Sequence, residues 1–322
     1  MIYVLKLLRK IYNTLFIKES NVKTSCISDP MIASNLIYEA LISPNPVMIA
    51  RFGSTELTCM VNGLGVKNPN FNVIKYIRGE TPPCWWEKNI ITQMQQWSGF
   101  FPANECKIEQ FVDLMLDDMK LVDILGSWQQ NESKLHLKAT KVHLRLLEPF
   151  WIENSWMRAL EHKKILVVHP FVDVMINQYK KKDFLFKNKS ILPDFGSLTG
   201  IKAVQSLGKA DNRFDDWFEA LEHMKNLIDN CDYDVCLIGA GAYGFPLAAH
   251  VKRSGKKAVH IGGSLQLLFG IIGKRWEDPN YGVREWNIPK GSYSNLINDY
   301  WVRPGENLKP KNAQQVEGAC YW

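Results

Sequence analysis

Short apolar runs alternate with amphipathic stretches along most of this chain of 322 residues. The runs at 46–51, 121–125, 164–168, 235–238 and 256–261, with part of 184–195, predict strands. The runs at 164–168 and 235–238 are apolar enough to be buried on both faces of a sheet. Apolar residues at helical spacing predict helices over 29–41 and 214–231. This alternation predicts an α/β fold of the Rossmann type, with a mostly parallel sheet and helices on both of its faces.

Residues 1–20 predict a separate amphipathic helix. Lys6, Arg9, Lys10 and Asn13 share one face of it, and nearly all other positions are apolar, which is typical of a helix lying in a membrane interface. The segment is too short and too interrupted by charge to span a bilayer. We expect it to attach the protein peripherally to the cytoplasmic face of an anionic membrane. The alternative is a helix docked on the domain.

The remaining residues, 21–322, are expected to form a single α/β domain that carries an aromatic tail from about residue 277. Four large aromatics stand out in this tail: Trp286, Trp301, Tyr321 and Trp322. They are predicted to cover a site, to bind a sugar, or to pack over the sheet.

A glycine loop follows the strand at 235–238, and a helix is expected from about Phe245. The loop is a G-x-G-x-x-G motif, in which such glycines let the backbone turn sharply and approach an anion at the start of the helix. A second glycine loop follows the next strand. Together the two loops predict a diphosphate seat made of Gly239, Gly241, Tyr243, Gly244, Gly262 and Gly263. The alternative is a glycine turn that only packs a helix on the sheet.

The dinucleotide fingerprint also requires an acidic residue at the end of the second strand, to hold a ribose. Here that strand ends at His260-Ile261-Gly262-Gly263, without a carboxylate. The prediction of an NAD-dependent oxidoreductase therefore rests on the glycine motif alone.

Other polar residues follow the predicted strands, where ligand groups gather in an open α/β sheet. Arg51, Gly53, Ser54 and Glu56 come after the first strand, and Glu56 is alternatively an ordinary first-turn carboxylate. The loop 126–132, with an indole and Glu132, suits a sugar or an exposed turn. The candidate roles of His169 are a base, a phosphate ligand, or a loop histidine that only makes hydrogen bonds within the protein. Lys274 and Arg275 neutralise a phosphate or form a solvated turn.

Composition excludes several classes of protein. The net charge of +6 is small and scattered, so no nucleic-acid partner is expected. The seven cysteines include no C-x-x-C pair, which favours reduced thiols in the cytoplasm. The sequence has no nucleophile elbow, no H-E-x-x-H and no Walker lysine loop, so hydrolase, zinc peptidase and P-loop ATPase activities lose support.

The order of three blocks resembles the GT-D type glycosyltransferases of bacterial surface-polysaccharide and adhesin-glycan synthesis. The blocks are A-R-F-G-x-x-E at 50–56, a central strand and loop, and a late glycine- and alanine-bearing pair at 241–248 and 255–262. The resemblance implies a Rossmann-type enzyme that uses a nucleotide sugar, with Mn²⁺ or Mg²⁺ held through an Asp-x-Glu motif. This sequence departs from the motif because Ser54 stands where the family has aspartate. Glu56 alone would be a poorer cation site.

These observations predict transfer of a sugar from a nucleotide-diphosphate donor to a glycan or lipid-linked acceptor. Glu56 would hold a metal or a donor hydroxyl, and Arg51, Lys274 and Arg275 would face the phosphates. The general base stays open among Glu132, His169 and His260. A non-catalytic nucleotide- or glycan-binding relative is the main alternative, and an NAD-dependent oxidoreductase is the third.

Overall fold

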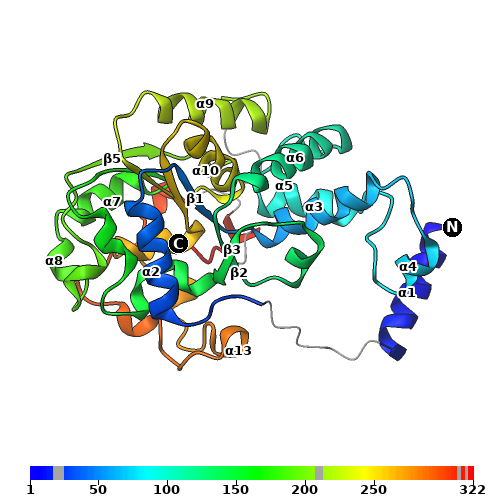
Figure 1. The fold of residues 1–322 in the computed structure, drawn as a ribbon, viewed down its shortest axis with the longest axis horizontal. Helices are drawn as coiled ribbons and strands as arrows, with labels where there is room; N and C mark the ends of the chain where they lie inside the picture. The colour runs from blue at the N-terminus through cyan, green and yellow to red at the C-terminus, as the bar shows by residue number, and fades with distance from the viewer. Residues whose placement is uncertain (17–24, 207–212, 310–312, 316–317) are drawn as a thin grey trace.

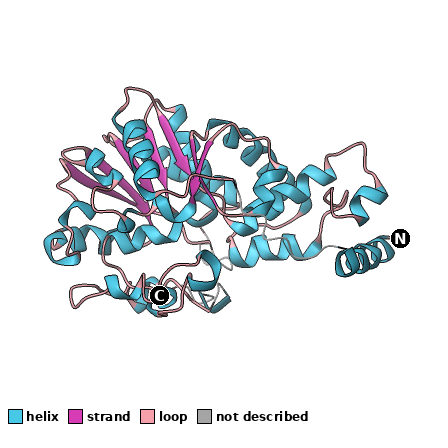
Figure 2. Ribbon diagram, turned by 60° about the horizontal axis from the view of Figure 1, so that its bottom comes forward, coloured by secondary structure: helices cyan, strands magenta, loops and turns pink. Residues whose placement is uncertain are grey.

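The structure is a computed structural model that describes residues 1–16, 25–206, 213–309, 313–315 and 318–322. Its centre is a seven-stranded sheet in the order β3-β2-β1-β7-β6-β4-β5, in which all neighbouring strands run parallel. Figure 2 shows the strands as one twisted layer among helices. The strands are β1 (Val47–Ala50), β2 (Ile124–Ser127), β3 (Thr140–His143), β4 (Lys164–His169), β5 (Ser197–Lys202), β6 (Val235–Ile238) and β7 (Lys257–His260). The prediction of a Rossmann-like α/β fold is confirmed.

Helices cover both faces of this sheet. Successive side chains of a strand point to opposite faces, and in the central strands both sets are apolar, so each face needs a covering layer. In β1, Met48 and Ala50 pack into a core with α3, α6, α9 and α10, whereas Val47 and Ile49 pack with α2, α7 and α11 (Figure 1). The α-helices are α1 (Ile2–Phe16), α2 (Pro30–Ile42), α3 (Ser54–Val66), α4 (Val73–Ile77), α5 (Lys88–Trp97), α6 (Glu105–Asp118), α7 (Val172–Tyr179), α8 (Lys182–Leu185), α9 (Trp217–Asp229), α10 (Gly244–Arg253), α11 (Leu265–Leu268), α12 (Lys274–Glu277) and α13 (Val283–Trp286).

The predicted elements differ from the structure mainly at the edges of the sheet. The strand expected within 184–195 is wrong, because this part of the chain holds α8 and a 3₁₀ turn at Lys189–Ile191. The two edge strands, β3 and β5, were not predicted from the sequence. Both are short of apolar residues, and β5 has only one buried position, so neither shows the apolar run of a central strand.

The N-terminal helix is present as α1, while residues 17–20 of the predicted segment lie outside the described residues. Its polar face turns toward the protein: Lys6 pairs with Glu87, and the Arg9 guanidinium lies 4.7 Å from the centre of the Tyr76 ring on α4. Figure 1 shows α1 beside α4 at one end of the molecule. Its apolar face is left exposed, with Leu7 57% and Leu15 69% accessible. None of the described helices is long and apolar enough to cross a bilayer.

One carboxyl group is buried beneath the C-terminal part of the chain. Tyr293 donates a hydrogen bond of 2.7 Å to Glu148, and both side chains are buried. Burial raises the pKa of Glu148 to about 7, although the Tyr293 hydroxyl and the charge of Arg145 act in the opposite direction. The Glu148 carboxyl therefore stays protonated through the range in which an ordinary glutamate ionises, and loses its proton only as the pH passes about 7.

Glu148→Gln is expected to remove part of the loss of stability at rising pH. The pKa of a glutamate in an unfolded chain is about 4.3, whereas that of Glu148 in the folded protein is about 7. Between these two pH values the unfolded chain ionises more readily than the folded one, so the free energy of unfolding falls as the pH rises from about 4.3 to about 7. The loss is on the order of 3 kcal/mol. Urea unfolding of both proteins at pH 5 and pH 8 measures it, and equal pH dependence in the two would contradict the assignment.

Candidate functional site

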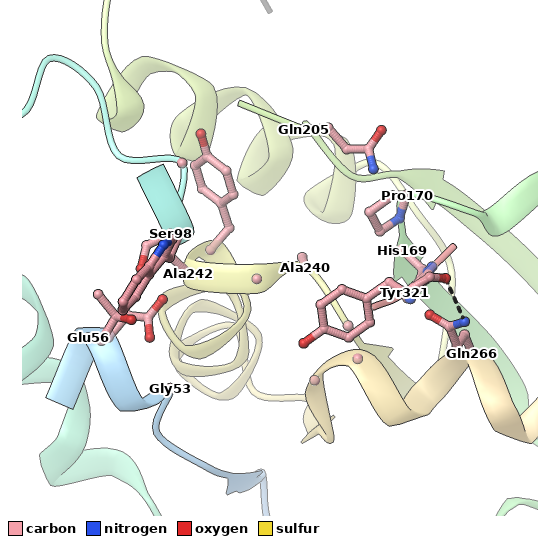
Figure 3. A pocket seen from close by; sticks show the side chains of 18 of the residues that line it. Gly53, Glu56, Ser98, His169, Pro170, Gln205, Ala240, Ala242, Gln266 and Tyr321 are labelled. Carbon is pink, nitrogen blue, oxygen red and sulfur yellow. Dashed lines mark hydrogen bonds between the residues drawn. The ribbon is translucent and has the colours of Figure 1, made fainter. Parts of the chain in front are cut away.

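A pocket of about 590 Å³ opens at the carboxyl end of the sheet (Figure 3). Most of the segments that line it lie at the ends of β1, β2, β4, β5, β6 and β7, and the others come from the end of α5, from α12 and from the C-terminal residues. The helix after β6 packs on one face of the sheet and the helix after β7 on the other. Helices that diverge from neighbouring strands leave a crevice, which is where open α/β sheets bind their ligands.

The two glycine loops meet in the lining of this pocket. A Cβ on Gly239 would lie 2.6 Å from the carbonyl oxygen of Gly262 and 2.7 Å from the His169 ring, so only glycine permits this approach. Gly241 and Gly262 have φ of +55° and +76°, which favours glycine. Gly241 and Tyr243 bound a 3₁₀ turn that lines the pocket and runs into α10.

Two other predicted glycines have different positions. A Cβ on Gly244 would meet the His260 ring at 2.3 Å, so this glycine packs the helix against β7 and lies outside the described pocket lining. Gly263 lines the pocket, and a Cβ there would lie 2.2 Å from the Tyr321 ring. The first glycine therefore joins helix and sheet, whereas the second seats an aromatic side chain.

Two arginines reach the pocket from separate parts of the chain. Nη1 of Arg51 donates to the carbonyl of Phe52 at 2.9 Å, while its Nε is buried without a hydrogen-bond partner beside Gly262. Arg275 donates from Nη2 to Sγ of Cys320 at 2.9 Å, and its guanidinium lies 4.8 Å from the centre of the Tyr321 ring. Buried N–H groups beside a glycine loop are suited to phosphate oxygens.

The structure separates the two basic residues that the sequence placed together. Arg275 lines the pocket, whereas its neighbour Lys274 is exposed and lies outside the described lining. Both residues begin the same short helix, α12, and the turn of that helix points their side chains in different directions.

Glu56 lies in the first turn of α3 and lines the pocket together with Ser54. Only 9% of Glu56 is exposed, and no described residue donates a hydrogen bond to its carboxylate. A Cβ on Gly53 would lie 1.8 Å from its Oε2, so the glycine provides the space that the carboxylate occupies. The arrangement leaves Glu56 available to a ligand.

These residues do not fit a metal site held by the protein alone. Glu56 is the sole side-chain carboxylate among the described residues that line the pocket. The described chain also contains no group of three or more histidine, cysteine or acidic side chains placed to hold a metal ion. A hard cation takes six or more oxygen ligands. One carboxylate would leave nearly all of them to the phosphates of a donor.

Both candidate histidines line the pocket in neutral form. The backbone N–H of Phe171 donates to Nδ1 of His169 at 3.0 Å, so the proton of that ring is on Nε2. His260 lies 3.2 Å from the carbonyl of Ile238 through Nδ1, which must donate and leaves Nε2 without a proton. Burial lowers the pKa of His169 to about 3, and burial with the charge of Arg51 lowers that of His260 to about 3. Both are weak bases near neutral pH.

Glu132 lies outside the described pocket lining and is fully buried. Its carboxylate accepts a hydrogen bond from Ser127 and bonds of 3.0 Å from the backbone N–H groups of Trp128 and Gln129. These three hydrogen bonds join the carboxylate to the end of β2 and to its own loop. Glu132 therefore shapes the loop and does not contact a ligand in the pocket.

The aromatic residues of the tail fall into two groups: two of them pack in the core beside the sheet, and two line the pocket. Trp301 is buried and donates from Nε1 to the carbonyl of Leu185 at 2.9 Å, and Trp286 packs on the same core. Tyr321 and Trp322 instead line the pocket. Figure 3 shows Tyr321 across the pocket from Glu56.

Gln266 is a pocket residue that sequence reasoning missed. It is fully buried, and its Nε2 donates to the carbonyls of Tyr321 at 3.1 Å and Ile271 at 3.3 Å. Its Oε1 has no hydrogen-bond partner. An amide inside the apolar stretch 265–269 was the signal that could have indicated it. Trp97 and Ser206 also line the pocket and were not predicted from the sequence. Trp97 is the last residue of α5 and Ser206 follows the edge strand β5, and no unusual residue pattern marks either position in the sequence.

Two solved structures are similar to this chain over most of its length. One, described as "Selenomethionine substituted structure of domain of unknown function 1792 (DUF1792)", has 11% identity and a TM-score of 0.33, with 92% of this chain and 98% of that one covered. The other, described as "The highly conserved domain of unknown function 1792 has a distinct glycosyltransferase fold", has 11% identity and a TM-score of 0.32, with coverage of 85% and 99%. No family model and no curated protein matches the sequence.

Proposed function

We propose that this protein transfers a sugar from a nucleotide-diphosphate donor to a hydroxyl group of an acceptor in surface-polysaccharide or glycoconjugate synthesis. The observation that carries the proposal is one pocket that combines two arginines, two glycine loops and a single carboxylate without a partner among the described residues. Arginines and backbone groups recognise phosphate oxygens. A carboxylate at the other side can accept a proton from a hydroxyl.

In this mechanism the diphosphate lies on Gly239–Gly241 and Gly262–Gly263, between Arg51 and Arg275. The acceptor oxygen attacks the anomeric carbon of the donor, and the new C–O bond replaces the bond to the diphosphate. The nucleoside diphosphate leaves with the electron pair of that bond, and the arginines stabilise the charge that develops on it. The acceptor proton passes to Glu56, which replaces the buried neutral histidines and Glu132 as the proposed base. No step requires a metal held by the protein.

The proposal is tested with a panel of nucleotide sugars, each incubated with the protein and a mixture of glycan acceptors. Release of a nucleoside diphosphate is measured with Mn²⁺, with Mg²⁺ and with a chelator. Release that depends on the protein supports a transferase, and the chelator shows whether a donor-held cation contributes. The departure at Ser54 favours a second candidate, a non-catalytic relative. Nucleotide-sugar binding without release would identify that candidate, and preferential binding of NAD would overturn both.

We also propose that α1 attaches the protein to the cytoplasmic face of an anionic membrane. The exposed apolar face of this helix supports the proposal, since Leu7, Ile11 and Leu15 are each more than 40% accessible. On α4, which packs beside α1, Val73 (44%) and Ile74 (61%) are exposed as well. Apolar residues of an interfacial helix bury themselves among lipid headgroups and acyl chains.

Replacing Leu7, Ile11 and Leu15 together by serine is expected to abolish sedimentation with anionic vesicles. Each leucine or isoleucine that enters the acyl boundary contributes roughly 1.5 kcal/mol or more, so three losses weaken binding at least about a hundredfold. Vesicles of phosphatidylglycerol and phosphatidylcholine are the probe. Equal sedimentation of the variant and the unchanged chain would refute membrane attachment through α1.

A further inference from the structure

Two tryptophans of this protein stay exposed, and both line the same pocket. All eleven tryptophans lie within the described residues, and Trp97 and Trp128 are the most accessible of them, at 47% and 37%. Keeping a large apolar surface in contact with water costs free energy that burial would recover. Exposed aromatic surface in the lining of a pocket therefore indicates a ligand that covers it.

The backbone that carries each indole is held by polar contacts behind it. The buried carboxylate of Glu132 accepts hydrogen bonds from the backbone N–H groups of Trp128 and Gln129. The Gln129 side chain in turn donates to the carbonyl of Phe52 at 3.2 Å, which ties this loop to the segment that precedes Glu56. These contacts place Trp128 relative to the proposed base.

The loop after Trp97 is fixed from another strand. Ser206 follows β5, is buried, and donates from Oγ to the carbonyl of Gly99 at 2.6 Å. Its Oγ also lies 2.8 Å from the hydroxyl of Tyr243 in the first glycine loop. Figure 3 shows Ser98, the residue after Trp97, on the same side of the pocket as Glu56 and across from Tyr321.

We propose that Trp97 and Trp128 form the subsite for the acceptor and that this acceptor is a glycan of pyranose rings. Indole faces stack on the C–H faces of sugar rings, and neighbouring amides and hydroxyls bond the sugar hydroxyls. The same pocket is also lined by the polar residues Ser98, Gln205 and Ser206, of which Ser98 directly follows Trp97 in the chain. Arg275, one of the two arginines proposed to hold the diphosphate, lies 4.8 Å from the centre of the Tyr321 ring. Figure 3 shows Tyr321 across the pocket from Glu56, so we place the donor toward Tyr321.

This inference gives the proposed function its acceptor class, but binding alone tests it. The full chain is applied to a glycan microarray, and the affinity for a retained glycan is measured by calorimetry. Trp97→Ala and Trp128→Ala are each expected to weaken that affinity about tenfold, and the double variant about a hundredfold. Trp97→Phe and Trp128→Phe should restore most of it because a stacking face remains.

Tyr300→Ala is the matched control, since Tyr300 is 48% exposed, stacks on Phe184 and lies outside the described pocket lining. Its glycan affinity should equal that of the unchanged chain. Absence of any retained glycan, or equal retention by the double alanine variant, would overturn the subsite. Nucleotide-sugar binding measured in parallel separates the two proposals. Glycan binding without nucleotide-sugar binding would uphold the glycan subsite and refute the transferase. Nucleotide-sugar binding without glycan binding would refute only the subsite.

Discussion

Glu56→Gln is expected to lower the rate of sugar transfer about a hundredfold or more, which is the usual contribution of a positioned proton acceptor. Glutamine has the shape of glutamate but cannot take the proton of the acceptor hydroxyl. The carboxylate makes no hydrogen bond with a described residue, so the folded state should lose little by the change. The loss should fall on kcat, with the KM for the donor nearly unchanged.

Steady-state rates, calorimetric donor affinity and the thermal midpoint of unfolding are the three measurements that this variant needs. Glu132→Gln is the comparison, because Glu132 is also a buried glutamate after a strand but holds three groups of its own loop. Glu132→Gln should lower the midpoint of unfolding, and Glu56→Gln should not. A Glu56→Gln enzyme with normal kcat would remove Glu56 from the mechanism.

Arg275→Ala is expected to weaken the binding of a nucleoside diphosphate tenfold to a hundredfold, whereas Lys274→Ala should leave it unchanged. A hydrogen bond to a charged group contributes about 1.5–3 kcal/mol, and about 1.4 kcal/mol corresponds to a tenfold change in affinity. The two residues are adjacent and carry the same charge, but only Arg275 lines the pocket. Their difference therefore measures a contact rather than the overall charge of the protein.

Calorimetry at low and high salt provides the check. A general electrostatic effect would appear in both variants and fade as salt screens it, whereas the loss of a direct contact would persist in Arg275→Ala alone. Arg275→Lys restores the charge without the planar fork and should recover only part of the affinity. Equal affinities of Arg275→Ala and Lys274→Ala would exclude the diphosphate position proposed between Arg51 and Arg275.

Central strands of the sheet were predictable from sequence because burial on both faces demands continuous apolar runs. β4 and β6 are such strands, and each ends at a loop that the sequence already marked, at His169 and at Gly239. The edge strands β3 and β5 were not predictable. An edge strand is covered on fewer sides, so a segment such as Thr140–His143 needs only one buried side chain to hold its place.

The sequence alone determined the alternation of the central strands with helices, the two glycine loops and the residues that follow each central strand. These are local properties, set by periodicity and by the backbone freedom of glycine. It could not distinguish Glu56 from Glu132, or Arg275 from Lys274, because members of each pair share residue type and similar local settings. Only the tertiary structure decided which side chains reach the pocket, since that depends on contacts between strands distant in the chain. It left one glutamate open to a ligand and enclosed the other within its own loop.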